Sequence, residues 1–249
     1  MINIKSSEEI RLMQISADIA SDCMQLLSRN IKVGVETKYL DEIAFDFISS
    51  KGGYPSFKGY HGFPASICAS INDEVVHGIP SSRKLNDGDI IGIDLGVYIN
   101  GYHSDMARTF TVGNVSQDAL NLVKCAKLCF EEAVKVMYPD NRLGDIGFAV
   151  QTAAEAHGYP VIRSLCGHGI GKELHESPEV LNFGRKGRGL RLKEGMVLAV
   201  EPMINIGKHD VVQLADGWTI TTKDKSLSAH YENTVYISSD GPVILTDKH

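Results

Sequence analysis

Carboxylate side chains interrupt the most apolar stretches of this sequence, and they are the residues best suited to do chemistry. Asp94 lies within the apolar run 90–95 and Glu201 within the apolar run 197–204, and both runs predict buried strands. A buried carboxylate without a partner costs several kcal/mol or takes up a proton. Cationic partners are therefore expected. The acids in question, and the histidines that could join them, are Asp94, Asp105, Glu201, Glu232, His77, His168 and His175.

The two aspartates can be placed relative to each other through a predicted hairpin. An Asn-Gly dipeptide, the strongest short hairpin signal, separates the strand-like runs 89–99 and 102–112. A two-residue turn there places Asp105 opposite Gly96, two residues from Asp94. Because alternate residues of a strand share a face, both carboxylates then lie on one face at diagonal distance.

The two glutamates belong to a second predicted strand pair. Its strands cover 196–204 and 233–237, with Glu232 at the entry of the second. If this pair joins the hairpin, four negative charges converge, and we expect no lysine or arginine of these strands to neutralise them. Two divalent cations would do so, with His168 as the only nitrogen ligand. The pattern therefore predicts a dinuclear metal site.

Each of these residues also has an ordinary explanation. Asp105 could be a turn residue, and Glu201, next to Pro202, could be an edge-strand charge that discourages aggregation. Turn or edge-strand roles can explain each residue alone, but they explain the occurrence of all of these residues together much less well. For His103 we expect a place beside the site or on the surface. Purely structural roles are predicted for His61, His157, His209, His230 and His249.

The composition fits a compact cytosolic enzyme. The 249 residues are 43% hydrophobic, enough for a substantial core, and carry a formal charge of −6. This charge disfavours binding of DNA or RNA through general phosphate attraction. We find no apolar run of membrane-spanning length and no secretion signal, so we expect the chain in the cytoplasm and not at a membrane. The five cysteines include no Cys-x-x-Cys pair, which favours buried thiols over zinc ligands or disulfides.

The secondary-structure signals recur along the chain. Helices are predicted after a capping box at Ser6, after Thr37, and at 116–137 and 143–157. Each pair of helices is followed by strands that carry two acids, first within about 1–113 and then within about 114–249. We expect an α+β fold of two pseudo-symmetric halves, each with two helices and antiparallel strands, around a shared metal site. Because both halves supply ligands, 1–249 is expected to act as one catalytic domain.

Two glycine-rich segments need separate interpretations. The spacing in 167–171 differs from that of nucleotide-binding loops, and its glycines more plausibly let the backbone bring His168 close to an ion. Segment 184–193 is the most basic part of the chain. We expect a solvated loop there, with a weak, transient contact to the ribosome as the alternative.

Five motifs follow one another along the chain: His77-Gly78-Ile79-Pro80, Asp94 with Asp105, residues 167–171 with His175, residues 200–203, and residues 230–234. Together they resemble the motifs of type I methionine aminopeptidases in their short bacterial form, which lacks an N-terminal zinc-binding extension. The resemblance implies the pita-bread fold and removal of the initiator methionine from new proteins and peptides, preferably when the next residue is small. The substrates would be the N-termini of nascent polypeptides.

The resemblance also implies a role for each ligand. Asp94 would chelate one metal, Asp105 and Glu232 would bridge both, and His168 and Glu201 would complete the other ion. A metal-bridging hydroxide would attack the substrate, since two metals lower the pKa of a shared water toward neutrality. This donor set suits Mn, Fe, Co or Zn.

Further residues would bind the substrate and assist the reaction. Glu201 would act as general base, His175 would stabilise the oxyanion, and His77 would hydrogen-bond the scissile amide or the next residue. An apolar slot for the methionine side chain would be formed by Tyr60, Phe63, Cys68 and Trp218. For these aromatic residues ordinary core packing is the alternative.

Two other functions are compatible with this pattern. A proline-specific (Xaa-Pro) aminopeptidase or dipeptidase of the same fold would use nearly the same ligands, and relative rates on Met-Ala and Xaa-Pro peptides would separate the two. A non-catalytic binding module on this fold would be expected to have lost ligands, yet all five are present. We expect a monomer.

Overall fold

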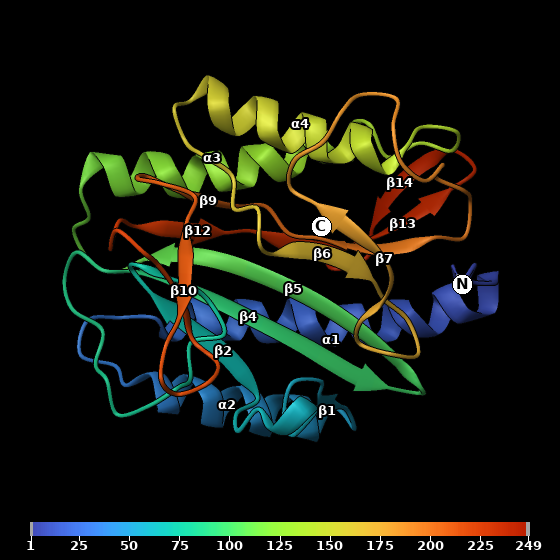
Figure 1. The fold of residues 1–249 in the computed structure, drawn as a ribbon. Coiled ribbons are helices and arrows are strands. Elements are labelled where there is room, and N and C mark those ends of the chain that lie inside the picture. Colours follow the sequence, from blue (N-terminus) through green and yellow to red (C-terminus); the bar gives the residue numbers. More distant parts are fainter. Residues whose placement is uncertain (1, 248–249) are drawn as a thin grey trace.

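A large, mostly antiparallel sheet forms the centre of the structure, a computed structural model that describes residues 2–247 (Figure 1). The strand order is β1-β4-β5-β13-β8-β6-β7, with β2 also paired to β4 and β14 to β13. The helices are α1 (Ser7–Asn30), α2 (Thr37–Ser50), α3 (Gln117–Val134), α4 (Leu143–Ala156) and the short 3-10 helix η1 (Tyr60–Gly62). The strands are β1 (Tyr54–Pro55), β2 (Ile67–Ile71), β3 (Glu74–Val76), β4 (Ile90–Ile99), β5 (Tyr102–Thr111), β6 (Cys166–Gly169), β7 (Glu176–Leu181), β8 (Val197–Val200), β9 (Met203–Asn205), β10 (Val211–Gln213), β11 (Ile220–Thr222), β12 (Ser228–His230), β13 (Glu232–Ser238) and β14 (Gly241–Ile244).

The helices pack in two pairs on different parts of this sheet. Apolar residues of α1 and α2 form one buried cluster with β2, β4 and β5. Apolar residues of α3 and α4 form a second cluster with β8 and β13. Figure 1 shows the two helix pairs on opposite sides of the view, with the strands between them. The expected α+β architecture is confirmed, and the strands that carry the acids lie where both cores meet.

Local signals place the helix ends well. At the start of α1, the backbone N–H of Ser6 donates to the Glu9 carboxylate at 2.9 Å, and the N–H of Glu9 donates to Ser6 Oγ at 3.3 Å, which completes the expected capping box. His157 caps the C-terminus of α4. The third helix ends at Val134, three residues before the predicted end at Met137.

The aspartate hairpin has the predicted register. Gly96 lies opposite Asp105 in the β4–β5 ladder. Both turn residues have positive φ, 55° at Asn100 and 85° at Gly101, as the favoured two-residue hairpin turn requires. Asp94 and Asp105 therefore start from the same face of the sheet.

The glutamate strands join this hairpin, as required for the acids to meet. β13 pairs with β5, where Glu232 lies opposite Ala107, and it also pairs with β8. One prediction is wrong in detail, because 196–204 is not a continuous strand. β8 ends at Val200 and β9 begins at Met203, since Pro202 has no N–H to donate to a ladder. Glu201 lies in this break.

A second, smaller sheet lies beside the central one. It has the strand order β10-β11-β3 and carries the segment that contains Trp218, between β10 and β11. A two-stranded ladder joins β9 and β12. Within residues 2–247, every helix is too short or too polar to cross a bilayer.

Candidate metal centre and substrate pocket

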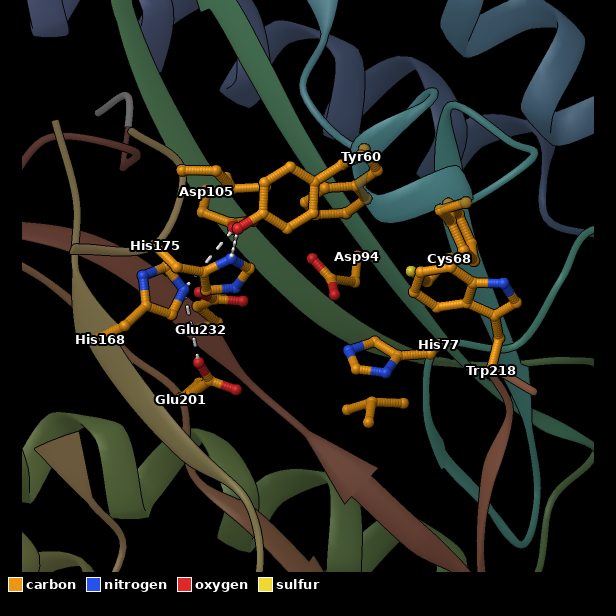
Figure 2. Close-up of a pocket in the computed structure, with 14 residues that line it drawn as sticks. Tyr60, Cys68, His77, Asp94, Asp105, His168, His175, Glu201, Trp218 and Glu232 are labelled. Atoms are coloured by element: carbon orange, nitrogen blue, oxygen red, sulfur yellow. Dashed lines mark hydrogen bonds and ion pairs between the residues drawn. The ribbon is translucent and has the colours of Figure 1, made fainter. Parts of the chain in front are cut away.

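One cavity of about 140 Å³ brings together the residues that the sequence predicts for the site (Figure 2). Figure 2 shows Asp105, Glu201, Glu232 and His168 on one side of this cavity, Cys68 and Trp218 on the other, and Asp94 between them. The cavity is lined by Phe57, Tyr60, Phe63, Cys68, Val76, His77, Asp94, Asp105, His168, Leu174, His175, Glu201, Trp218 and Glu232.

The four carboxylates converge from different strands without enough partners. Asp94 comes from β4, Asp105 from β5, Glu232 from β13, and Glu201 from the break after β8. Asp105 and Glu232 are only 3% and 2% exposed. Within residues 2–247, Oδ1 of Asp94, Oδ1 of Asp105 and Oε1 of Glu232 are buried and accept no hydrogen bond. Buried oxygens in this state are suited to a cation.

The electrostatics of the cluster support the same conclusion. Burial raises the pKa of Asp94 to about 7. Burial first, and repulsion between the acids second, raise the pKa values of Asp105, Glu201 and Glu232 well above the usual range. Without a cation these groups therefore favour the protonated state. A divalent ion would displace the protons and remove the repulsion.

One cation does lie close to the acids, contrary to expectation. The half-buried Arg108 on β5 donates from Nη1 to the backbone oxygen of Glu232 at 2.5 Å, and from Nη2 to Oδ1 of Asn233 at 2.8 Å. Its guanidinium group stacks on the ring of Tyr231 at 4.0 Å. The positive charge lowers the pKa of Glu232, but burial and Asp94 outweigh this effect. Arg108 therefore anchors β13 and leaves the carboxylate oxygens free for another partner.

His168 on β6 is held as a neutral ligand. Its Nδ1 lies 2.9 Å from the carbonyl oxygen of Gly169, which can only accept, so Nδ1 carries the proton. Nε2 then presents a lone pair, 3.9 Å from Asp105 Oδ2 and 3.8 Å from Glu201 Oε1. Burial lowers the pKa of His168 to about 3. A lone pair that faces carboxylates is unfavourable unless a cation lies between them.

The separations fit ligands of one ion. Two donor atoms that each lie about 2.1 Å from a transition-metal ion are at most about 4.2 Å apart. Asp105, His168 and Glu232 form one group of potential ligands, and His168 Nε2 lies 3.9 Å from Asp105 Oδ2, within this limit. Asp94, His230 and Glu232 form a second group of this kind. Glu232 belongs to both.

The glycines around His168 have the role expected from the sequence. A Cβ on Gly167 would lie 2.3 Å from the backbone oxygen of Ala199 on the neighbouring strand β8. Only glycine allows this close approach between the strands. The tight packing brings His168 into the carboxylate cluster.

His175 lies at the opening of the cavity and contacts Tyr60. The distance between His175 Nδ1 and the Tyr60 hydroxyl is 2.8 Å, and the His175 ring lies 4.1 Å from the His168 ring. Partial burial first, and His77 second, lower the pKa of His175, so the ring is neutral at pH 7. The following residue, Glu176, accepts from Lys5 Nζ at 2.5 Å. This buried ion pair ties the His175 loop to the N-terminal segment.

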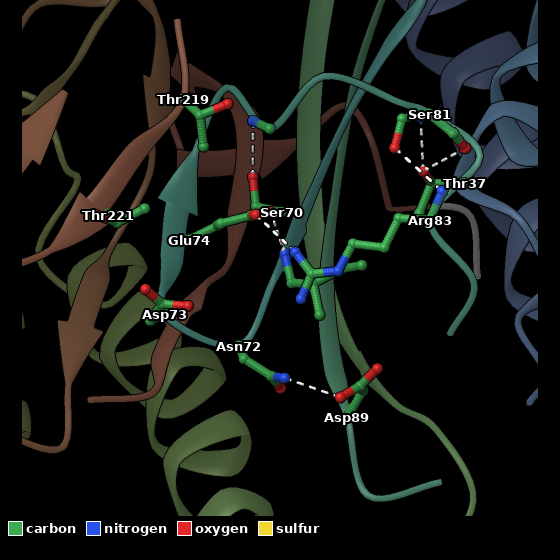
Figure 3. A network of polar contacts seen from close by, with 12 residues as sticks. Thr37, Ser70, Asn72, Asp73, Glu74, Ser81, Arg83, Asp89, Thr219 and Thr221 are labelled. Carbon is green, nitrogen blue, oxygen red and sulfur yellow. Dashed lines mark hydrogen bonds and ion pairs between the residues drawn. The ribbon is translucent and has the colours of Figure 1, made fainter. Parts of the chain in front are cut away.

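His77 begins the loop after β3, and a polar network that includes Ser70, Glu74 and Arg83 surrounds this region (Figure 3). His77 itself has a positive φ of 60°, which is uncommon for a non-glycine residue. The N–H of Gly78 donates to Ser70 Oγ at 3.1 Å, and a Cβ on Gly78 would lie 2.5 Å from the backbone oxygen of Ala69. Arg83 and Glu74 close the network with an ion pair of 2.8 Å. These contacts therefore hold the backbone next to His77, whose side chain lines the cavity.

The side of the cavity away from the acids is apolar. Phe63 and Trp218 meet edge to face, with ring centroids 5.1 Å apart. Cys68 is buried opposite Asp94 on the neighbouring strand β2. Burial, followed by the charge of Asp94, raises the pKa of the Cys68 thiol, so it stays neutral. An apolar, sulfur-containing surface of this kind suits a thioether side chain.

His230, at the end of β12, does not fit the purely structural role predicted for it. It is 3% exposed, and its Nε2 lies 3.8 Å from Glu201 Oε2 and 3.7 Å from Glu232 Oε2. A usable signal was present, because residues two apart along an extended chain share a face, and His230 precedes Glu232 by two.

The other histidines outside the cavity lie largely where expected. His103 is half-buried beside the site, with Nδ1 2.9 Å from Ser56 Oγ. His157 is the C-cap of α4. His249 lies outside the residues that the structure describes.

Comparison with known proteins defines the class. Residues 11–239 match the metallopeptidase family M24, and the chain belongs to this family. A methionine aminopeptidase of Clostridium perfringens is 51% identical over 246 residues, which cover 99% of each chain. The crystal structure of methionine aminopeptidase from Rickettsia prowazekii superimposes on this structure with a TM-score of 0.98 at 41% identity. The match covers 99% of this chain and 100% of the Rickettsia chain.

A more distant match extends the fold comparison. A prolidase from Pyrococcus furiosus shares the fold, with a TM-score of 0.81 at 23% identity, and this chain covers 66% of that chain. The expected pita-bread fold and the resemblance to methionine aminopeptidases are thereby confirmed. The protein is a metal-dependent peptidase, and its acids and imidazoles are a suitable donor set for divalent metal.

Proposed function

We propose that this protein removes the N-terminal methionine from new proteins and peptides, preferably when the second residue is small. The observation that carries this proposal is the division of one cavity into an acidic side and an apolar side. A hydrolytic centre next to a small apolar slot suits cleavage of a single terminal residue. The relatives named above carry the same activity in their names.

We propose two divalent ions, drawn from Mn, Fe, Co and Zn. Asp105, His168 and Glu201 would hold one, Asp94 would hold the other, and Glu232 would belong to both, with Asp105 as a second bridge. When bound, the ions supply Lewis-acid activation of water and of the substrate carbonyl. The free α-amino group of the substrate would also meet this acidic side, which restricts cleavage to the chain end.

The remaining chemistry comes from three side chains of the protein. Glu201, whose oxygens lie 3.8 Å from the Nε2 atoms of His168 and His230, would take a proton from the attacking water and pass it to the departing amine. His175 would donate a hydrogen bond to the carbonyl oxygen as negative charge develops there, an interaction typically worth ~3 kcal/mol. His77 would hydrogen-bond the scissile amide or the next residue.

The apolar side of the cavity would select the first side chain. The slot formed by Phe63, Cys68 and Trp218 has no charged group that could bind a polar substrate side chain. A methionine side chain can fill it with its flexible thioether. Tyr60 lies between the slot and His175, since its hydroxyl reaches His175 and its ring lines the cavity.

We further propose that the whole chain acts as one monomeric catalytic domain in the cytoplasm. The ligands come from both the aspartate hairpin and the glutamate strands, so neither half could hold the ions alone. The basic segment 184–189 lies in a loop that is mostly exposed, which leaves it available for a transient contact with the ribosome.

The function is tested with purified enzyme and short peptides. We expect metal-dependent release of methionine from Met-Ala-Ser, abolished by EDTA, and little or no cleavage of Xaa-Pro peptides. Glu201→Gln should lower kcat/KM by about 1000-fold or more, because it removes both a ligand and the base. The exposed Glu194→Gln is the matched control and should retain full activity. Faster cleavage of Xaa-Pro would favour a proline-specific peptidase, and no cleavage by metal-loaded protein would favour a binding module.

Replacing Tyr60 with Phe tests how His175 is positioned. The change removes only the hydroxyl that contacts His175 Nδ1, and leaves the apolar ring in place. We expect kcat to fall about 10-fold with little change in KM, because His175 would act on the transition state more than on the bound peptide. Tyr54→Phe is the control, since the hydroxyl of this exposed residue contacts only the backbone oxygen of Lys58. An unchanged kcat would show that the Tyr60 hydroxyl does not assist the reaction.

A further inference from the structure

His230 is a buried imidazole among the acids that the reaction proposed above does not use. Its side chain projects from the end of β12 toward Glu201 and Glu232, and its Nε2 has no hydrogen-bond partner among the described residues. A buried imidazole nitrogen in this state is uncommon, because loss of hydration costs free energy. The Nε2 atom of His230 therefore needs a bound partner other than the residues that the structure describes.

The backbone holds His230 in place on both sides. Its N–H donates to Thr109 Oγ1 at 3.0 Å, and its carbonyl oxygen accepts from the same hydroxyl at 2.9 Å. Thr109 lies on β5, the strand of Asp105. The backbone that carries the ring is therefore held by the sheet, and the ring nitrogen faces the acids.

The distances around His230 fit shared coordination better than a hydrogen bond. Nε2 lies 3.7 Å from Glu232 Oε2 and 3.8 Å from Glu201 Oε2, beyond hydrogen-bond range. They lie within the limit of about 4.2 Å for two ligands of one transition-metal ion. His168 stands in the same relation to Asp105 and Glu201, at 3.9 Å and 3.8 Å.

We propose that Nε2 of His230 is a ligand of the second metal ion, together with Asp94 and Glu232. Each of these three residues offers a ligand atom within 4.8 Å of the other two. This inference rests on the proposed two-ion site and adds a second imidazole to it. Each ion then has one nitrogen ligand, His168 for the first and His230 for the second.

The second imidazole changes which metals the centre prefers. Imidazole nitrogen suits Zn, Fe, Co and Ni, whereas an all-oxygen set suits Mn, Mg and Ca. With His230 as a ligand, the second subsite binds Co(II) much more tightly than Mn(II). Without it, the second subsite keeps Asp94 and Glu232 and loses most of this preference.

The test is metal binding to the full-length protein after removal of bound metal with EDTA. Calorimetric titrations with Co(II) and with Mn(II) compare the wild type, His230→Gln and His175→Gln. We expect His230→Gln to weaken binding of the second Co(II) at least about 10-fold, with a smaller effect on Mn(II) and none on the first ion. The visible spectrum of the second Co(II) should change as well. His175→Gln removes another imidazole of the same cavity and should bind both ions as the wild type does.

Two further measurements test the role of His230 independently of metal titration. Thermal melting of metal-free His230→Gln shows whether the variant is folded. A crystal structure of the wild-type protein with Co(II) tests the inference without any substitution, since His230 Nε2 should lie about 2.0–2.3 Å from an ion. An ion more than about 3 Å from Nε2, or unchanged Co(II) binding by folded His230→Gln, overturns it. Wild-type protein that binds no ion contradicts the proposed function itself, a result distinct from failure of His230 alone.

Discussion

Replacing Glu232 with Gln is expected to lower kcat/KM for Met-Ala-Ser by at least about 1000-fold, which corresponds to about 4 kcal/mol of lost transition-state stabilisation. Glu232 is the one acid that belongs to both groups of candidate ligands. Its amide replacement keeps the shape but loses the charge that both ions would share. Peptide hydrolysis and metal content, measured on the same sample, should fall together.

The same substitution should stabilise the protein once metal is removed. In the metal-free state Glu232 is buried among other acids, which raise its pKa together with burial itself. A neutral amide removes this cost, so the melting temperature in EDTA should rise by several °C, or about 1–3 kcal/mol. Exposed Glu194→Gln is the control for both measurements. Full activity, or a lower melting temperature in EDTA, would contradict the cation-binding role of this residue.

The second large effect is a loss of stability of the metal-free protein as the pH rises from about 7 to about 8.5. Buried carboxyl groups with raised pKa values keep their protons in the folded state, whereas they are already ionised in the unfolded state. The folded state therefore binds more protons, and its stability must fall as the pH rises through the folded-state pKa values. Asp94, with a pKa of about 7, contributes at the lower end of this range.

Other titrating groups change the stability mainly outside the range from about pH 7 to about pH 8.5. The pKa values of His168 and His230 are lowered to about 3 by burial. A lowered histidine pKa removes stability as the pH falls below about 6.5, which opposes the carboxylate effect in acid but is absent above pH ~7. Buried thiols such as Cys23, whose pKa is raised to about 12, affect stability only above about pH 8.5.

Thermal melting in EDTA at several pH values measures the effect. We expect a decrease of several °C across the window, and a smaller decrease for Glu232→Gln, which lacks one of the acids. A divalent ion at about 100 times its Kd should restore about 2.7 kcal/mol per site at the upper pH. A melting temperature that does not depend on pH in EDTA would contradict the raised pKa values of these buried carboxyl groups.

Features governed by local rules could be predicted from the sequence. The Asn-Gly turn fixes the register of the β4–β5 hairpin, so the relation of Asp94 to Asp105 followed from strand alternation alone. The capping box at Ser6 fixed the start of α1. The broader fold and the reaction came from the resemblance of whole motifs to a known family.

Features governed by tertiary contacts could not be predicted in the same way. His230 reaches the acids only because β12 and β13 continue past a break, and Glu201 lies in a similar break between β8 and β9. Arg108 was missed as a neighbour of Glu232 because its contact depends on the pairing of β13 with β5. The backbone next to His77 depends on contacts that link the loop after β3 to strand β2.

The smaller sheet described above carries one wall of the pocket and none of the candidate metal ligands. Asp94, Asp105, His168 and Glu232 all lie on strands of the nine-stranded sheet, whereas Trp218 lies just before β11 of the three-stranded sheet. Substitutions around Trp218 can therefore reshape this wall without altering any strand that carries a ligand. Tolerance for different terminal residues can change during evolution while the ligand positions stay the same.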